Sequence, residues 1–162
     1  MKYLLALIII LTSSILYSQN KMELSAAFNA GVCAHGSSQI DPYTGVDIEA
    51  RHNNFSIFVS GSGAFSFDSL NSNIYEFIIG PRWYIGDPKK FNVSIETGFG
   101  DFIYSKNTGS SHKLGISLGG GLHYPISVKT DLGLKGRYNF HKGGYGTSMG
   151  EVYLSFRYHF NK

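Results

Sequence analysis

The chain has 162 residues and a formal net charge of +3, a length that accommodates a single domain. Charged residues make up 15% of it, against roughly 25% in a typical globular domain, while aromatic residues also reach 15% and there are 20 glycines. The basic residues are few and scattered, so we expect no nucleic-acid partner. The single cysteine, Cys33, excludes an internal disulfide and a cysteine-rich metal site.

The first predicted element along the chain is an export signal. Lys2 precedes an apolar run over residues 4–11, and a polar stretch then leads to Tyr17-Ser18-Gln19, which together make the three parts of a secretory signal peptide. The apolar run falls short of the roughly 20 residues that a transmembrane helix needs. We expect residues 1–18 to be the signal peptide and residues 19–162 to form the mature domain. Because no later segment is a candidate helix, this domain can span a membrane only with strands.

From Met22 onward, apolar or small residues alternate with polar ones at a period of two. The alternation predicts eight strands, at residues 22–34, 44–52, 55–67, 74–85, 91–104, 113–124, 128–140 and 150–160. Short connections at 52–54, 86–90 and 125–127 alternate with longer, Gly- and Ser-rich ones at 35–45, 68–73, 105–112 and 141–149. This order is typical of an up-and-down membrane barrel with both termini on the side of the short turns. Pro81, inside the fourth strand, predicts a bulge or an early end to pairing.

The two faces of the predicted strands differ in chemistry. One carries nearly all of the strand charges, in similar numbers of acids and bases, and only Asp101 falls on the other face. A narrow barrel lumen requires such balance, because an unpaired charge there would be costly. The charges expected to fill the lumen are Glu49, Arg51, Glu76, Arg82, Glu96, Asp131, Lys135, Arg137, Glu151 and Arg157. The expected register places opposite charges across from each other: Arg82 and Glu96, Arg137 and Glu151, and Asp131 and Arg157.

Aromatic residues on the apolar face collect toward strand ends, as girdles at the two membrane interfaces do. On the side of the short turns they are Phe55, Trp83, Phe91, Tyr124, Tyr158 and Phe160, and on the other side Phe65, Phe67, Tyr75 and Phe140. Alternation alone does not separate a membrane barrel from a soluble, lipocalin-like ligand-binding barrel. Charge balance, cross-strand pairs and aromatic rims favour an all-β, eight-stranded antiparallel up-and-down transmembrane β-barrel.

With these features the chain resembles the small outer-membrane β-barrel proteins, of which the membrane domain of OmpA and the whole of OmpX are familiar types. The resemblance covers everything after the signal, and its most characteristic stretches are Gly80-Pro81-Arg82-Trp83-Tyr84 and the final strand at 152–160. It implies a monomer in contact with outer-membrane lipid and a terminal aromatic residue, here Phe160, that the barrel-assembly machinery recognises. Asn161 and Lys162 follow this aromatic and displace the signal slightly from the chain end.

The resemblance also raises an enzyme as an alternative, because lipid A deacylases use a small outer-membrane barrel with a catalytic His-x-Ser near the last hairpin. His141 fits the first place, but Gly143 stands in the third, and Ser148 and Glu151 are only nearby, so no triad carries over. The sequence therefore predicts a protein without catalytic residues and without a cofactor.

Other chemistry has weaker support. His35, His112 and His141 fall in predicted outer loops but lack the fixed spacing of metal ligands. The run Gly119-Gly120-Gly121 lies mid-strand, without the Lys-Ser/Thr of a phosphate-binding loop. We expect these small residues to make room in a crowded lumen. A diffusion pore would require a lumen wider than eight strands enclose. We expect a side-chain-plugged barrel that acts in membrane integrity or through loop-mediated surface interactions.

Overall fold

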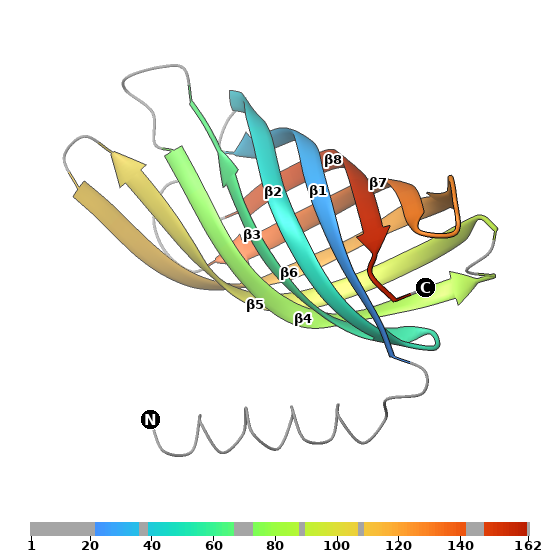
Figure 1. Cartoon of the computed structure of the whole chain (residues 1–162). Helices are drawn as coiled ribbons and strands as arrows, with labels where there is room; N and C mark the ends of the chain where they lie inside the picture. The colour runs from blue at the N-terminus through green and yellow to red at the C-terminus, as the bar shows by residue number, and fades with distance from the viewer. Residues whose placement is uncertain are drawn as a thin grey trace, which may run out of the picture.

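The computed structural model describes residues 22–35, 39–66, 73–87, 90–106, 109–141 and 148–161. In these residues the chain forms a closed antiparallel barrel in which each strand pairs with its sequence neighbours and β8 closes on β1 (Figure 1). The eight strands are β1 Met22–His35, β2 Gln39–His52, β3 Phe55–Ala64, β4 Asn73–Gly86, β5 Asn92–Lys106, β6 Gly109–Pro125, β7 Thr130–His141 and β8 Ser148–His159. The predicted eight-stranded up-and-down barrel is confirmed.

Some predicted elements differ at their ends or lie elsewhere. β2 begins at Gln39 and β6 at Gly109, so the connections expected at 35–45 and 105–112 are largely strand, while β3 ends at Ala64. The stretch Asp41-Pro42-Tyr43 suggests a turn, but it pairs with β1, where Val32 lies opposite Pro42. The ladder thus satisfies backbone groups that a loop would leave to water. The predicted signal peptide and Phe67 lie outside the described residues.

Pro81 does not end the fourth strand, and no bulge forms. Before it Ile79 pairs with Phe99, and after it Arg82 pairs with Glu96 in the same register, so only Gly80 and Pro81 drop out of the pairing between β4 and β5. Proline lacks the N–H that a ladder requires, which accounts for the gap. A Cβ on Gly80 would lie 1.9 Å from the Thr97 carbonyl oxygen, so the missing side chain lets the two strands approach closely.

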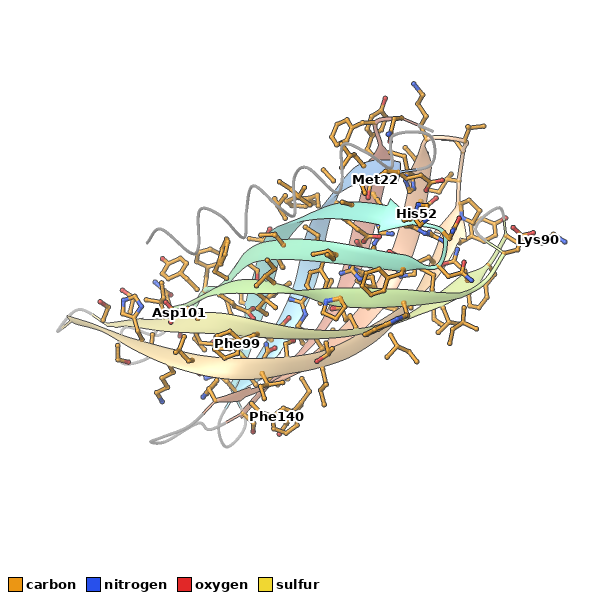
Figure 2. All side chains as sticks on the ribbon, turned by 90° about the horizontal axis from the view of Figure 1, so that it is seen from below. Met22, His52, Lys90, Phe99, Asp101 and Phe140 are labelled. Carbon is orange, nitrogen blue, oxygen red and sulfur yellow. The ribbon has the colours of Figure 1, made fainter. Side chains whose placement is uncertain are left out.

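The two ends of the barrel are distinct. Met22, His52 and Lys90 lie together at the end of the short turns, which we call the turn end, whereas Asp101 lies toward the opposite loop end (Figure 2). Asn161 donates from Nδ2 to the Met22 carbonyl oxygen at 2.6 Å. Both ends of the described chain therefore meet at the turn end. Among the described residues, no helix has the length and apolar character to cross a membrane.

The alternation in the sequence becomes a separation of inside from outside. Large apolar side chains on all eight strands point outward, and most of them are 40% to 68% exposed (Figure 2). Charged and polar side chains at the intervening positions are buried within the barrel. Successive side chains of a strand point to opposite faces, so this division follows directly from the period of two.

Candidate functional site

The centre of the lumen is organised around Arg82 of β4, whose side chain is fully buried. Its Nε donates to Glu96 Oε2 at 2.6 Å and its Nη2 to Asp47 Oδ2 at 3.0 Å, and its Nη1 donates to Glu49. The guanidinium carbon also lies 4.4 Å from the centre of the Phe58 ring. One guanidinium therefore joins carboxylates from β2 and β5, which lie on either side of β4 in the barrel.

Each of those three carboxylates also contacts a second cation. Lys135 Nζ donates to Asp47 Oδ2 at 2.8 Å, and Arg137 Nε donates to Glu96 Oε1 at 3.0 Å. Arg157 Nη2 lies 3.2 Å from Glu49 Oε2. The Tyr84 hydroxyl donates to Glu49 Oε1 at 2.7 Å and accepts from Arg157 Nη1 at 2.5 Å. The result is a continuous network in which no cation depends on a single partner, the arrangement that makes buried charge tolerable.

Two smaller polar groups lie on either side of this network. Toward the loop end, Asn139 Nδ2 donates to Glu76 Oε2 at 3.0 Å and also to Glu151. Toward the turn end, His159 Nε2 lies 2.7 Å from Asp131 Oδ2. The lumen is thus filled along its length by side chains that contact one another.

All ten charges that the sequence assigned to the lumen are buried inside the barrel, none more than 4% exposed. The register places Arg82 opposite Glu96, Arg137 opposite Glu151 and Asp131 opposite Arg157. The first two pairs are in contact, at 2.6 Å and 3.7 Å. The third is opposite in register only: Arg157 extends to Glu49, and the Asp131 carboxylate accepts from His159. A long side chain selects its partner across the lumen, which strand register alone does not specify.

Sequence reasoning missed several polar lumen residues. Asp41 is buried and its Oδ2 lies 2.6 Å from His35 Nε2, but both fell in a predicted loop. Asn29 donates from Nδ2 to Asp47 Oδ1 at 2.9 Å, and Tyr84 and Asn139 complete the contacts described above. Tyr84 and Asn139 each lie two positions from a recognised lumen charge of the same strand, Arg82 and Arg137. Alternation would therefore have placed both inside if uncharged polar residues had been named individually.

The glycine run of β6 makes room for the network. A Cβ on Gly119 would lie 3.1 Å from Glu96 Cγ, and one on Gly121 would lie 2.7 Å from Lys135 Cγ. Both positions point inward, where a larger residue would displace the charged side chains. The expected role as space for a crowded lumen is therefore confirmed for Gly119 and Gly121.

The outer wall carries the aromatic residues assigned to the turn-end girdle, all of them exposed: Phe55, Trp83, Phe91, Tyr124, Tyr158 and Phe160. Phe55 and Trp83 pack edge to face with ring centroids 5.5 Å apart, and Tyr158 and Phe160 do so at 5.6 Å. Asp101 lies on this outer face, as its position in the alternation predicts, and its carboxylate is 2.9 Å from His112 Nδ1. A hollow of about 460 Å³ interrupts the wall where Ala34, Gly136 and Gly150 replace large side chains.

The candidate catalytic and metal-binding residues are not brought together. The His141 imidazole Nε2 lies 2.5 Å from the Tyr104 hydroxyl, while Glu151 contacts Asn139 and Arg137 inside the lumen. His35, His112 and His141 thus lie on three different strands, β1, β6 and β7, and each has its own partner. Within the described ranges, no three His, Cys, Asp or Glu side chains are grouped so as to hold a metal ion.

Comparison with solved structures identifies the fold. The neisserial surface protein NspA superposes with a TM-score of 0.63 at 14% identity, over 85% of this chain and 96% of that one. The N-terminal β-barrel domain of OprF from Pseudomonas aeruginosa gives 0.65 at 11% identity, over 86% and 100%. The outer membrane enzyme PagL gives 0.54 at 15% identity, over 82% and 98%. No protein-family model and no curated protein matches the sequence. The chain therefore has the fold of the small eight-stranded outer-membrane β-barrels.

Proposed function

We propose that this protein is a non-enzymatic barrel of the bacterial outer membrane, with its turn end and both termini in the periplasm. The observation that carries the proposal is the inversion of the usual protein interior, since ionisable and polar side chains fill the centre and apolar side chains cover the outside. Soluble monomers rarely expose contiguous apolar patches larger than a few hundred Å². An apolar surface that surrounds all eight strands is stable when hydrocarbon covers it.

Closure of the sheet supports the same location. Because β8 pairs with β1, the barrel has no free lateral edge along that seam, and its backbone groups are satisfied between neighbouring strands. Closed barrels and helices are the structures that meet this requirement in hydrocarbon. A soluble lipocalin-like barrel is disfavoured, because its ligand-binding interior would have to accommodate the ion-pair network of this lumen.

The filled lumen favours a role in the membrane itself or at its surface over diffusion of solutes. Arg82 and its three carboxylates occupy the centre of an eight-stranded barrel, whose interior is only just wide enough for side chains. We propose that the barrel contributes to membrane integrity or acts through its loops, as a monomer surrounded by lipid. Residues 1–18 would direct export, and the barrel-assembly machinery would recognise Phe160.

Fractionation of cells combined with a denaturing gel tests the location. We expect the protein in the outer-membrane fraction, and we expect the unboiled, folded barrel to migrate differently from the boiled chain. The variant Leu154→Asp places a charge on the outward face of β8, where Leu154 is 57% exposed. We expect it to lower the amount of folded protein in the outer-membrane fraction. Recovery of the unaltered protein in the soluble periplasm, without a shift on boiling, would contradict the proposal.

An enzyme acting on outer-membrane lipid is the second candidate, because the fold of PagL, described as an outer membrane enzyme, resembles this barrel. The contact between His141 and Tyr104 argues against a matching site, since it engages the histidine without a serine nucleophile. Mass spectrometry of lipid A from cells with and without the protein separates the two candidates. Unchanged lipid A supports the non-enzymatic proposal, whereas loss of an acyl chain that depends on His141 would establish the enzyme.

A further inference from the structure

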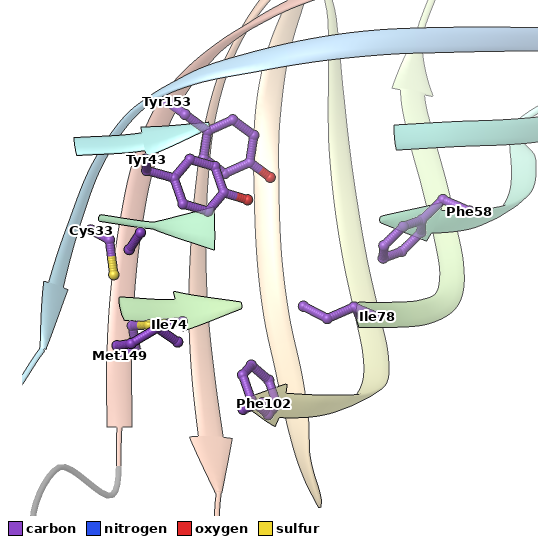
Figure 3. Packing of buried hydrophobic residues seen from close by; sticks show 9 residues of the cluster. Cys33, Tyr43, Phe58, Ile74, Ile78, Phe102, Met149 and Tyr153 are labelled. Carbon is purple, nitrogen blue, oxygen red and sulfur yellow. The ribbon is translucent and has the colours of Figure 1, made fainter. Parts of the chain in front are cut away.

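The loop end of the lumen has a different composition from its charged centre. Six buried, mostly apolar side chains occupy inward positions near the loop ends of their strands, and we call them the loop-end layer: Cys33, Tyr43, Ala64, Ile74, Phe102 and Met149 (Figure 3). None is more than 2% exposed. They come from β1, β2, β3, β4, β5 and β8, so six of the eight strands contribute one residue each.

The two remaining strands complete the layer in another way. On β6 the inward position is Gly115, and a Cβ there would lie 2.9 Å from Phe102 Cε2, so the Phe102 ring occupies the space that this glycine leaves. The same ring packs against His141 of β7, with ring centroids 5.2 Å apart. Phe102 therefore spans from β5 over β6 to β7 and closes the side of the lumen where the layer has no large apolar residue of its own.

Below this layer the lumen is mostly polar, with Phe58, Ile78 and Tyr153 among its buried apolar or aromatic residues. It contains buried groups that lack a protein partner, among them Asn29 Oδ1, Ser117 Oγ and Ser155 Oγ. Buried polar atoms of this kind are commonly satisfied by internal water. Ion pairs and water can rearrange, so a charged centre by itself is a weak barrier to small ions. A packed apolar constriction excludes both water and ions, because neither finds hydrogen-bonding partners within it.

We propose that the loop-end layer is a hydrophobic seal that prevents water and ions from entering the lumen at the loop end, independently of the ion pairs beneath it. The inference rests on the fold alone and holds wherever the barrel resides, so its test is separate from that of the proposed function. Phe102 is the central residue of the seal, since its ring covers β6 and contacts β7.

The accessibility of Cys33 to solvent measures whether the seal is closed, because Cys33 is the only cysteine of the chain and lies within the loop-end layer. We would measure the rate at which a small, positively charged methanethiosulfonate modifies this thiol in the folded barrel, in micelles and in bilayers, with urea-unfolded protein as the fully reactive reference. The folded wild type should react far more slowly than the unfolded chain. Phe102→Ala should raise the rate by about tenfold or more, because it opens the layer to solvent.

Two controls isolate the seal from general loosening of the barrel. Phe99→Ala makes the same change on the same strand but on the outer face, where Phe99 is 54% exposed, and it should leave the rate unchanged. Glu96→Gln weakens the charged centre below the layer and should also leave the thiol protected. The shift of unboiled protein on a denaturing gel reports which variants are folded, and Met149→Ala serves as the second seal variant if Phe102→Ala does not fold.

Three outcomes would overturn the proposal. The first is rapid modification of Cys33 in the folded wild type. The second is a folded seal variant that reacts no faster than wild type. The third is an increase caused by Glu96→Gln as large as that caused by the seal variant, which would make the ion pairs the barrier.

Discussion

Replacement of Arg82 by methionine is the sharpest test of the lumen network. The change keeps an unbranched side chain of similar reach but removes a cation that binds Glu96 at 2.6 Å, Asp47 at 3.0 Å, and Glu49. Loss of one partner from a buried ion pair typically costs about 3–5 kcal/mol, because the other partner remains buried and charged. Each of these three carboxylates retains a second cation, so we expect a loss of about 3–5 kcal/mol in total and not three times that amount.

The assay uses the single tryptophan, Trp83, which neighbours Arg82 in β4 and faces outward. Its fluorescence follows unfolding by denaturant of the barrel refolded in bilayers, and Lys129→Met, at an exposed position beside the last turn, controls for loss of a positive charge. A cycle of Arg82→Met and Glu96→Gln, singly and together, should show a combined loss smaller than the sum of the single losses. A loss below about 1 kcal/mol for Arg82→Met would refute the view that this network holds the lumen together.

Three further predictions address packing, the outer wall and assembly. Gly80→Ala should destabilise the barrel by at least about 1–3 kcal/mol, because the new methyl group overlaps the Thr97 carbonyl. Gly61→Ala is the control and should not destabilise it, because no atom lies within 4 Å of the new Cβ. Denaturant titration measures the stability of both variants. Leu154→Arg should cost about 2–4 kcal/mol in a bilayer if this outward position lies near its midplane, and an unchanged stability there would contradict lipid contact. Phe160→Ala should lower the folded protein in cells, measured by the gel shift, while leaving refolding of purified protein largely intact.

The alternation of apolar and polar residues determined most of the fold. A period of two defines strands and divides each into two faces, so eight strands, their pairing order and the burial of residues such as Glu49 and Lys135 followed without tertiary information. Glycine at 119 and 121 was correctly interpreted for the same reason, since a mid-strand position excludes a phosphate-binding turn. Strand ends were less well defined, because Asp41-Pro42 has the composition of a turn although its pairing with β1 keeps it in the sheet.

Only the tertiary structure decided which charges meet. Register brings Asp131 opposite Arg157, yet Arg157 extends to Glu49 of β2, because long side chains in a narrow lumen reach residues on strands that are distant in sequence. The loop-end layer has the same origin. Alternation correctly assigns Phe102 to the inside of the barrel. Its ring covers Gly115 and contacts His141 because three neighbouring strands curve around a common axis. Periodicity assigns a side chain to the inside, and the closed geometry of the barrel selects what it contacts there.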